Sequence, residues 1–251
     1  MAADTTVIVQ LSDSHLRPDE PHRAVQFAEA IRQVTELEPA PVAVLLTGDV
    51  ADHGVRESYE SAAELLAALP MPVHVIPGNH DDRATMRGVL GAPGEDDDEI
   101  RFAVQAGPIR VIGCDTLIPG SIEGQLDVAW LAGQLAEAPT TPTLIAMHHP
   151  PVQIGFAKMD GYGLPATTRA ALEDLLAEHP QVLKIVTGHV HRAASAQIGR
   201  VPVITAPSVN FQLDLDLVGD RLAVGEDPPG FMIHVLVDGQ LVSHVQPVLR
   251  V

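Results

Sequence analysis

Short apolar runs alternate along the chain with amphipathic stretches, and this alternation predicts the order of strands and helices. Five runs are short, apolar and partly β-branched, which is typical of buried strands. They are Val7–Leu11, Val42–Leu46, Val73–Ile76, Thr143–Met147 and Val182–Val186. Four stretches between them have helical spacing and end at or just before a proline: His22–Glu38, Val55–Leu69, Asp127–Glu137 and Thr167–Glu178. The pattern predicts an α/β fold.

The last part of the chain has a different pattern, with turn residues and alternating side chains. Residues 212–217 alternate polar and apolar side chains, as a strand with one buried face does. Phe231–Val237 and Leu241–Val245 flank the Asp238–Gly239 pair, which favours a hairpin. We therefore expect antiparallel strands from about residue 196 to residue 251, completing a second sheet packed on the first. With a motif-bearing core from about residue 7 to residue 191, they would form one domain spanning residues 1–251.

The charge of the chain narrows the class of partner. Its 251 residues contain 15 Lys and Arg against 33 Asp and Glu, so the formal net charge is −18. Nucleic-acid-binding proteins usually carry a basic patch, and this sequence contains no run of Lys or Arg. An acidic surface also repels a polyanion at long range, so we expect a small substrate and no nucleic-acid partner.

The sequence also bears on location. The N-terminus lacks a basic segment followed by a long apolar run, and no stretch approaches 18 uninterrupted apolar residues, so we expect neither a secretory signal nor a membrane span. The single cysteine, Cys114, follows the apolar run Ile109–Gly113, which favours a buried thiol at a strand end over a nucleophile. One cysteine excludes an intrachain disulfide and is compatible with a reducing compartment. We expect a cytoplasmic protein without a membrane partner, and a homo-oligomer remains open.

Each of the five predicted strands leads directly into a polar cluster. The clusters are Ser12-Asp13-Ser14-His15, Thr47-Gly48-Asp49, Gly78-Asn79-His80-Asp81, His148-His149 and Gly188-His189-Val190-His191. Each cluster alone is weak evidence, because Gly-Asp is a common turn and Asp-x-His is often a cap or a surface pair. Ligands of open α/β sheets bind outside the carboxyl ends of strands, so five such clusters are expected to converge.

The residue types in these clusters indicate a metal centre. Carboxylate oxygen and imidazole nitrogen together suit divalent first-row metals such as Mn, Fe, Co or Zn. Two ions roughly 3.5–4 Å apart can bind both an attacking hydroxide and the phosphoryl oxygens of a phosphoester. Asp-x-His and His-x-His would place both side chains on one face of an extended segment. Glycines before Asp49, Asn79 and His189 would allow tight turns and close approach of the backbone to a ligand.

The order Asp-x-His, Gly-Asp, Gly-Asn-His-Asp, His and Gly-His-x-His resembles the signature of the calcineurin-like metallophosphoesterases. The resemblance covers residues from about 7 to 191. It implies a two-sheet mixed β-sandwich flanked by helices, with two metal ions at one edge. Carried over by motif, Asp13, His15 and His191 would hold the first ion, Asp49 would bridge both, and Asn79, His148 and His189 would hold the second.

Three further residues near the motifs receive an interpretation, two of them from the same resemblance. His80 resembles the family's histidine beside the leaving group, a general acid or phosphate donor. Asp52, three residues after Asp49, matches a Gly-Asp-x-x-Asp pattern whose second Asp orients that histidine. An N-cap of the following helix is an equal alternative for Asp52. For His149, a packed histidine is preferred over a residue that supports a metal ligand or contacts the substrate.

A second group of residues suggests a branch of the family. The stretch from His149 to Leu164, together with Pro228–Phe231, resembles the branch that contains bacterial class III cyclic-nucleotide phosphodiesterases and glycerophosphodiesterases. The resemblance implies hydrolysis of small phosphodiesters, with cyclic AMP as the leading substrate. The alternatives are a glycerophosphodiesterase, a broad-specificity phosphomonoesterase and a non-catalytic metal-binding scaffold. The segment from Gln153 to Leu164 is expected to close one side of the pocket over a small leaving group.

Overall fold

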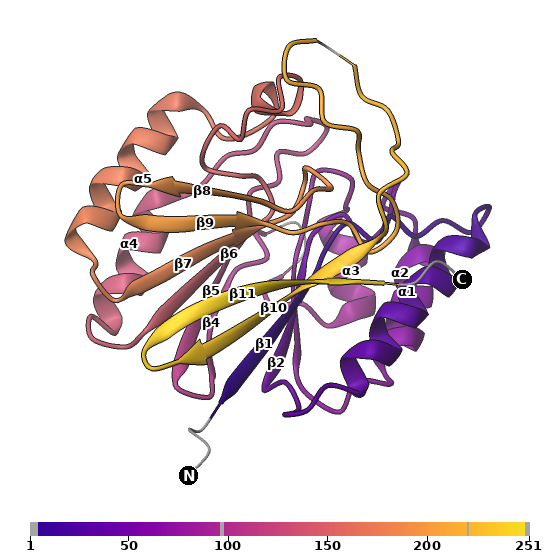
Figure 1. Ribbon diagram of the computed structural model, residues 1–251, viewed down its shortest axis with the longest axis horizontal. Helices are drawn as coiled ribbons and strands as arrows, with labels where there is room; N and C mark the ends of the chain where they lie inside the picture. The colour runs from indigo at the N-terminus through magenta and orange to yellow at the C-terminus, as the bar shows by residue number, and fades with distance from the viewer. Residues whose placement is uncertain (1–4, 96–97, 220, 249–251) are drawn as a thin grey trace.

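Two mixed β-sheets stack face to face, and helices cover their outer faces (Figure 1). The computed structural model describes residues 5–95, 98–219 and 221–248. Helices α1 (Pro21–Thr35), α2 (Arg56–Leu66) and α3 (Arg83–Leu90) lie on one side of the sandwich, and α4 (Val128–Glu137) and α5 (Ala166–Glu178) lie on the other. The predicted α/β sandwich is therefore confirmed, and its layers form a single domain.

The first sheet has the strand order β11-β10-β1-β2-β3. Its parallel part consists of β1 (Thr6–Leu11), β2 (Ala43–Thr47) and β3 (Val73–Ile76). The hairpin of β10 (Gly230–Val237) and β11 (Gln240–Pro247) extends it on the free side of β1, with β10 antiparallel to β1. This hairpin turns at Asp238–Gly239, as the sequence predicts.

The second sheet has the strand order β4-β5-β6-β7-β9-β8. Four neighbouring strands are parallel: β5 (Ile109–Cys114), β6 (Thr143–Met147), β7 (Val182–Thr187) and β9 (Val201–Thr205). The edge strands β4 (Phe102–Ala106) and β8 (Ala194–Ile198) are antiparallel to their neighbours. A short 3₁₀ turn, η1 (Met159–Gly161), lies between β6 and α5.

Two predictions about the last part of the chain are wrong. Only β8 and β9 complete the second sheet, whereas β10 and β11 join the first. The reason is that β1 is buried along its whole length, and β10 pairs with an edge that would otherwise be unpaired. Residues 212–217 form no strand beyond the isolated bridge between Leu213 and Val224, because Asp216 accepts hydrogen bonds from the next backbone amides and turns the chain. Residues 249–251 lie outside the described part.

The hydrophobic core forms three layers that match the architecture. One cluster joins the first sheet to α1, α2 and α3, and includes Phe27, Tyr59 and Met86. A second fills the space between the sheets, and a third joins the second sheet to α4 and α5. Cys114 is buried at the end of β5, as predicted. Within the described residues, no helix is long and apolar enough to cross a membrane.

Candidate metal centre

The loops that follow β1, β2, β3, β6 and β7 meet at one edge of the sandwich. Parallel strands end at the same edge of their sheet, and direct hydrogen bonds join the two sheets there. The ring Nδ1 of His148 lies 2.8 Å from the carbonyl oxygen of Thr47, and the backbone N–H of His189 donates to Asp13 at 3.1 Å. The predicted convergence of the five clusters is therefore observed.

One group of side chains gathers four ligand-type residues, Asp13, His15, Asp49 and His191, whose nearest ligand atoms all lie within 4.8 Å of one another. Nε2 of His15 is 3.0 Å from Nε2 of His191 and 3.5 Å from Oδ2 of Asp49. Nε2 of His191 is 3.4 Å from Oδ1 of Asp13. These four residues are the set expected for the first ion together with the bridging carboxylate.

A second group shares Asp49 with the first. Nε2 of His148 is 3.4 Å from Oδ2 of Asp49 and 3.2 Å from Oδ1 of Asn79. Nδ1 of His189 is 2.9 Å from the same Asn79 oxygen. Oδ2 of Asp49 therefore lies within 3.5 Å of histidines from both groups, which is the position that a bridging ligand requires.

Hydrogen bonds on the outer side of the imidazole rings fix where their lone pairs point. Nδ1 of His15 faces Oδ1 of Asp52 at 2.8 Å, and Nδ1 of His191 faces the carbonyl oxygen of Phe211 at 3.0 Å. Both oxygens only accept, so each Nδ1 carries the proton and the neutral ring presents a lone pair at Nε2. The two Nε2 atoms then face each other across 3.0 Å, where lone pairs repel unless a positive charge lies between them.

A divalent metal ion fits this arrangement better than a proton does. Burial lowers the pKa of His191 to about 4, although Asp13 acts in the opposite direction. Metal–ligand bonds of about 2.0–2.2 Å place neighbouring ligands roughly 3.0–3.4 Å apart, and the ligand atoms here are separated by similar distances. Histidines that donate their other N–H to a carboxylate or a carbonyl are the usual form of metal-binding histidine.

Asp49 dominates the electrostatics between the two groups. Burial acts to raise the pKa of its carboxyl, but the charge of His148 and a hydrogen bond from that ring outweigh burial and hold the pKa well below the ordinary value. In the other direction, Asp49 raises the pKa of His148 to about 9 against the effect of burial. The field of Asp49 therefore favours positive charge at this place, whether carried by a proton or by a metal ion.

The backbone at the site is left-handed, which corrects the expectation of extended segments. Five of the expected ligands have positive φ, between 43° and 72°: Asp13, His15, Asp49, His189 and His191. Left-handed backbone is uncommon outside glycine and concentrates at functional sites. Side chains in Asp-x-His and Gly-His-x-His therefore converge through turns, and the two-residue period of a strand does not apply.

The three motif glycines are needed for two different reasons. Gly48 has a φ of +88°, so it supplies a left-handed turn. Gly78 and Gly188 do not have positive φ; instead they are crowded by the site itself. A Cβ at residue 78 would lie 2.2 Å from Oδ1 of Asp49, and one at residue 188 would lie 2.1 Å from Oγ of Ser12.

His80 lies beside the two groups, and its imidazole is only partly buried. Its backbone N–H donates to Oδ1 of Asp49 at 2.9 Å, and Nδ1 of its ring lies 2.8 Å from the carbonyl oxygen of Asp52. Burial acts to lower the pKa of His80, but the hydrogen bond to Asp52 and the charge of Asp49 raise the pKa to about 9. Its ring is therefore a proton donor at neutral pH, and Nε2 is the nitrogen left to face a substrate.

Asp52 contacts two of the site histidines. Its Oδ1 is 2.8 Å from Nδ1 of His15 and 3.3 Å from Nδ1 of His80, and Arg17 approaches its other oxygen at 3.3 Å. The alternative that Asp52 caps the following helix is wrong, because the N-cap of α2 is Val55, which makes no side-chain cap. Although His15, Asp52 and His80 cluster tightly enough to hold an ion, hydrogen bonds already join their facing atoms.

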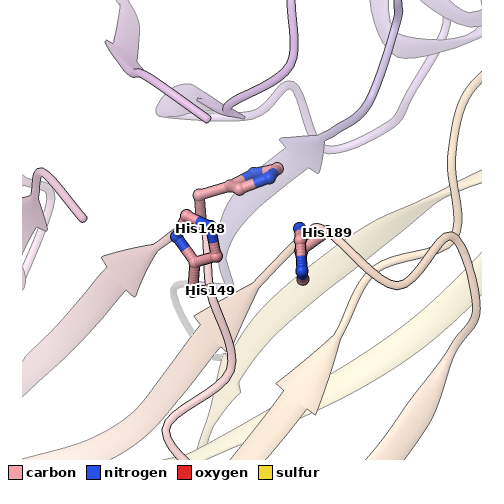
Figure 2. A group of neighbouring side chains, drawn as sticks. All are labelled: His148, His149 and His189. Atoms are coloured by element: carbon pink, nitrogen blue, oxygen red, sulfur yellow. The ribbon is translucent and has the colours of Figure 1, made fainter. Parts of the chain in front are cut away.

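His149 is adjacent to the second group but is held by the protein. Figure 2 shows His148 and His149 leaving the chain in different directions, with His189 opposite them. Nε2 of His149 faces the carbonyl oxygen of Ile122 at 3.2 Å, so it carries the proton, and Nδ1 accepts from the hydroxyl of Thr116 at 2.8 Å. Both ring nitrogens are used, which matches the preferred interpretation of a packed histidine.

Asp81 is a site residue that the sequence interpretation passed over. Its buried carboxylate accepts from the backbone N–H of Val50 at 3.1 Å, of Gly78 at 2.9 Å and from the hydroxyl of Tyr59 at 2.9 Å. It therefore ties the loop that carries Asp49 to the loop that carries Asn79. The signal was present, because Asp81 ends the Gly-Asn-His-Asp motif.

Comparison with known proteins matches these observations. A family model described as calcineurin-like phosphoesterase matches residues 6–193. The chain is 34% identical to a probable glycerophosphodiester phosphodiesterase, GpdQ, of Arcobacter nitrofigilis over 95% of this chain and 92% of the relative. It is also 34% identical to the 3′,5′-cyclic adenosine monophosphate phosphodiesterase CpdA of Pseudomonas aeruginosa over 89% and 85%. A dimetal phosphatase from Danio rerio has the same fold, with a TM-score of 0.74 at 16% identity over 98% and 97% of the two chains.

Proposed function

Because the chain belongs to the calcineurin-like phosphoesterase family, as a metal-dependent phosphoric ester hydrolase, we propose that it is a dinuclear phosphodiesterase of small substrates, with cyclic AMP first among 3′,5′-cyclic nucleotides. One observation carries the metal centre: Oδ2 of Asp49 lies 3.5 Å from Nε2 of His15 and 3.4 Å from Nε2 of His148. A shared carboxylate between two sets of nitrogen and oxygen ligands is the arrangement that a pair of ions needs.

The proposed ligands divide between the two ions as the family resemblance implies. Asp13, His15 and His191 hold the first ion, Asn79, His148 and His189 hold the second, and Asp49 belongs to both. The mixed nitrogen and oxygen donors suit Mn, Fe, Co or Zn. When bound, the two ions activate the attacking water and offset negative charge on the phosphoryl oxygens.

The residues around the ions supply orientation and a proton. His80 donates a proton to the leaving oxygen from Nε2, because its Nδ1–H is directed at the carbonyl oxygen of Asp52. Asp52 holds the rings of His15 and His80 at once, so it positions a metal ligand as well as the general acid.

The surroundings of the site favour a small substrate. Phe156 and Met159 bury themselves against Val190, the residue between His189 and His191, so the segment from Gln153 to Leu164 lies next to the metal centre. This position supports its proposed role as one wall of the pocket. The net charge of −18 disfavours binding of long polyanions, whereas two metal ions suffice to attract one phosphate.

A glycerophosphodiester is the second candidate substrate. The observation that favours it is the 34% identity to a probable glycerophosphodiester phosphodiesterase, which equals the identity to the cyclic AMP phosphodiesterase. Both candidates are small diesters of phosphate, so the same metal centre and the same proton donor would serve either reaction.

The discriminating experiment is a comparison of kcat/KM with Mn²⁺ for cyclic AMP, glycerophosphoethanolamine, an aryl phosphomonoester and a single-stranded oligonucleotide at matched phosphate concentration. We expect the highest value for cyclic AMP and the lowest for the oligonucleotide. A higher value for glycerophosphoethanolamine would make the second candidate the function, and a higher value for the oligonucleotide would contradict a small-substrate enzyme.

A further inference from the structure

A glutamine inside the sandwich joins the two sheets just behind the metal centre. Gln10, in β1, is fully buried. Its amide nitrogen donates to Oγ1 of Thr47 at 2.9 Å and to the carbonyl oxygen of Thr187 at 3.0 Å. Thr47 ends β2 in the first sheet and Thr187 ends β7 in the second. One amide group therefore bridges the sheets directly before the Gly48-Asp49 and Gly188-His189 turns.

The orientation of this amide is fixed by a polar chain from the C-terminal hairpin. Nε2 of His234 lies 3.2 Å from Oε1 of Gln10, and because that oxygen only accepts, Nε2 carries the proton. Nδ1 of His234 then accepts from the hydroxyl of Ser243 at 2.8 Å, and Ser243 accepts from Nζ of Lys184 at 2.6 Å. Because these hydrogen bonds direct Oε1 of Gln10 toward His234, its NH₂ group points toward Thr47 and Thr187.

The two threonines lead to ligands proposed for the second ion. The carbonyl oxygen of Thr47 accepts from Nδ1 of His148 at 2.8 Å, so its position sets the direction of that ring. Gly188, which follows Thr187, donates its N–H to the carbonyl oxygen of His148 at 3.0 Å. His189 comes next in the chain, so the position of Thr187 sets the turn that carries it.

The rings of the first ion are held by other bonds. His15 is fixed by Asp52, and His191 is fixed by the carbonyl oxygen of Phe211. Neither bond passes through Gln10. Gln10 therefore supports His148 and His189 most directly, whereas His191, two residues further along the same turn, has its ring held by Phe211.

We propose that Gln10 is a positioning residue for the second metal site, held in its working orientation by His234, Ser243 and Lys184. This inference rests on the proposed function, because it takes His148 and His189 as ligands of the second ion. It gives the C-terminal hairpin a part in the active site although none of its residues is a proposed ligand. Gln10, His234 and Lys184 are buried, so the role of the polar chain is to orient ligands, without contact with the substrate.

The test is the number and affinity of Mn²⁺ ions bound by the Gln10→Met variant, measured by equilibrium dialysis with metal analysis and by the EPR signal of a spin-coupled Mn²⁺ pair. Methionine keeps the length of the side chain and removes the amide. We expect the first ion to bind as in the wild type and the second about tenfold more weakly, the lower end of the effect of groups that orient metal ligands. The coupled signal should disappear at Mn²⁺ concentrations where the wild type holds both ions.

Two further variants separate positioning from general stability. Gln181→Met removes another buried glutamine, which bonds to Leu135 and His179 at the opposite end of β7, and it should keep both ions. Gln10→Met combined with His234→Leu leaves no unpaired histidine N–H, so stability should recover while second-ion affinity stays low. Recovery of that affinity in the double variant, or unchanged affinity in Gln10→Met, would overturn the role of Gln10. A wild type that binds at most one ion would overturn the metal centre and this inference with it.

Discussion

The two halves of the proposed metal centre have similar geometry but different charge. The first half contributes the carboxylate of Asp13 in addition to the shared Asp49, whereas the second contributes the neutral amide of Asn79. Each half also contributes two histidines. Because ligand charge count tunes the affinity of a metal site, the first half should bind its ion more tightly than the second.

The hydrogen bonds that hold the histidine rings also differ between the two halves. His15 in the first half is held by the carboxylate of Asp52. His148 in the second half is held by a main-chain carbonyl, at Thr47, whose side chain bonds to Gln10. His15 is therefore oriented by a charged side chain, whereas His191 and His148 are both oriented by main-chain carbonyls, and of the two carbonyl-bearing residues it is Thr47 that bonds to the buried amide of Gln10.

The largest loss of activity is expected for a change at Asp49, the ligand that the two halves share. Asp49→Ala removes one ligand from each ion, so it should reduce kcat/KM more than any other single ligand change, by roughly 10³-fold or more if several kcal/mol of transition-state stabilisation are lost. Steady-state kinetics and metal analysis would measure this. The matched control is Asp174→Ala on the exposed face of α5, which should leave both quantities unchanged. Full activity of Asp49→Ala would exclude a shared ligand.

The next effect concerns a residue that belongs to neither half. His80→Ala should keep both ions and lose turnover by roughly 10²–10⁴-fold, as expected for a general acid. A substrate with a p-nitrophenolate leaving group needs little protonation, so it should recover much of the loss. Loss of bound metal in this variant would instead place His80 among the ligands.

A smaller effect sharpens the charge comparison. Asn79→Asp gives the second half a second carboxylate, and at a distance of about 4 Å one added charge is worth roughly 1–4 kcal/mol. The second ion should therefore bind about tenfold or more tightly, with the affinity of the first ion as the internal control. Isothermal titration of the metal-free chain with metal would show the affinities of the two binding steps becoming more similar. An unchanged difference between the two metal affinities would mean that the charge of the ligands does not cause that difference.

The smallest effect concerns the buried His234, which holds Gln10 behind the second half, and it is measured as the pH dependence of stability. Burial, with the charge of Lys184, lowers the pKa of His234 to about 3 from its ordinary value of 6.5. As pH falls, His234 becomes protonated at a higher pH in the unfolded chain than in the folded chain. The contribution of neutral His234 to the free energy of unfolding is therefore present above pH 6.5 and is lost toward pH 3. The slope is about 1.4 kcal/mol per pH unit at most. Urea unfolding of His234→Leu between pH 6 and 4 should therefore show a shallower loss than the wild type, and equal slopes would contradict a neutral buried histidine.

Much of the site could be predicted from the sequence because its residues follow strands. Parallel strands end at one edge of their sheet, so a ligand-type residue after each strand is enough to predict that Asp13 lies near Asp49 and His148 near His189. The backbone could not be predicted in the same way. The left-handed turns at the ligands depend on contacts across the two sheets, as the crowding of Gly188 against Ser12 shows.

The parts of the fold that were not predicted have similar causes. Helix α3 is only eight residues long, although its cap residues Asp82 and Gly91 were a readable signal. The pairing of β10 with β1 depends on which strand edge is uncovered, and no local pattern records that. Gln10 stood in the sequence as one polar residue inside the apolar run Val7–Leu11, but its partners Thr47 and Thr187 are 37 and 177 residues away.

The dinuclear phosphodiesterase is tested most directly by titrating the metal-free chain with Mn²⁺ and measuring cyclic AMP hydrolysis against the number of ions bound. The rate should remain low up to one ion per chain and reach its maximum at two, because the bridge at Asp49 operates only when both sides are filled. A maximum rate at one bound ion per chain, or hydrolysis that does not depend on metal, would contradict the shared centre.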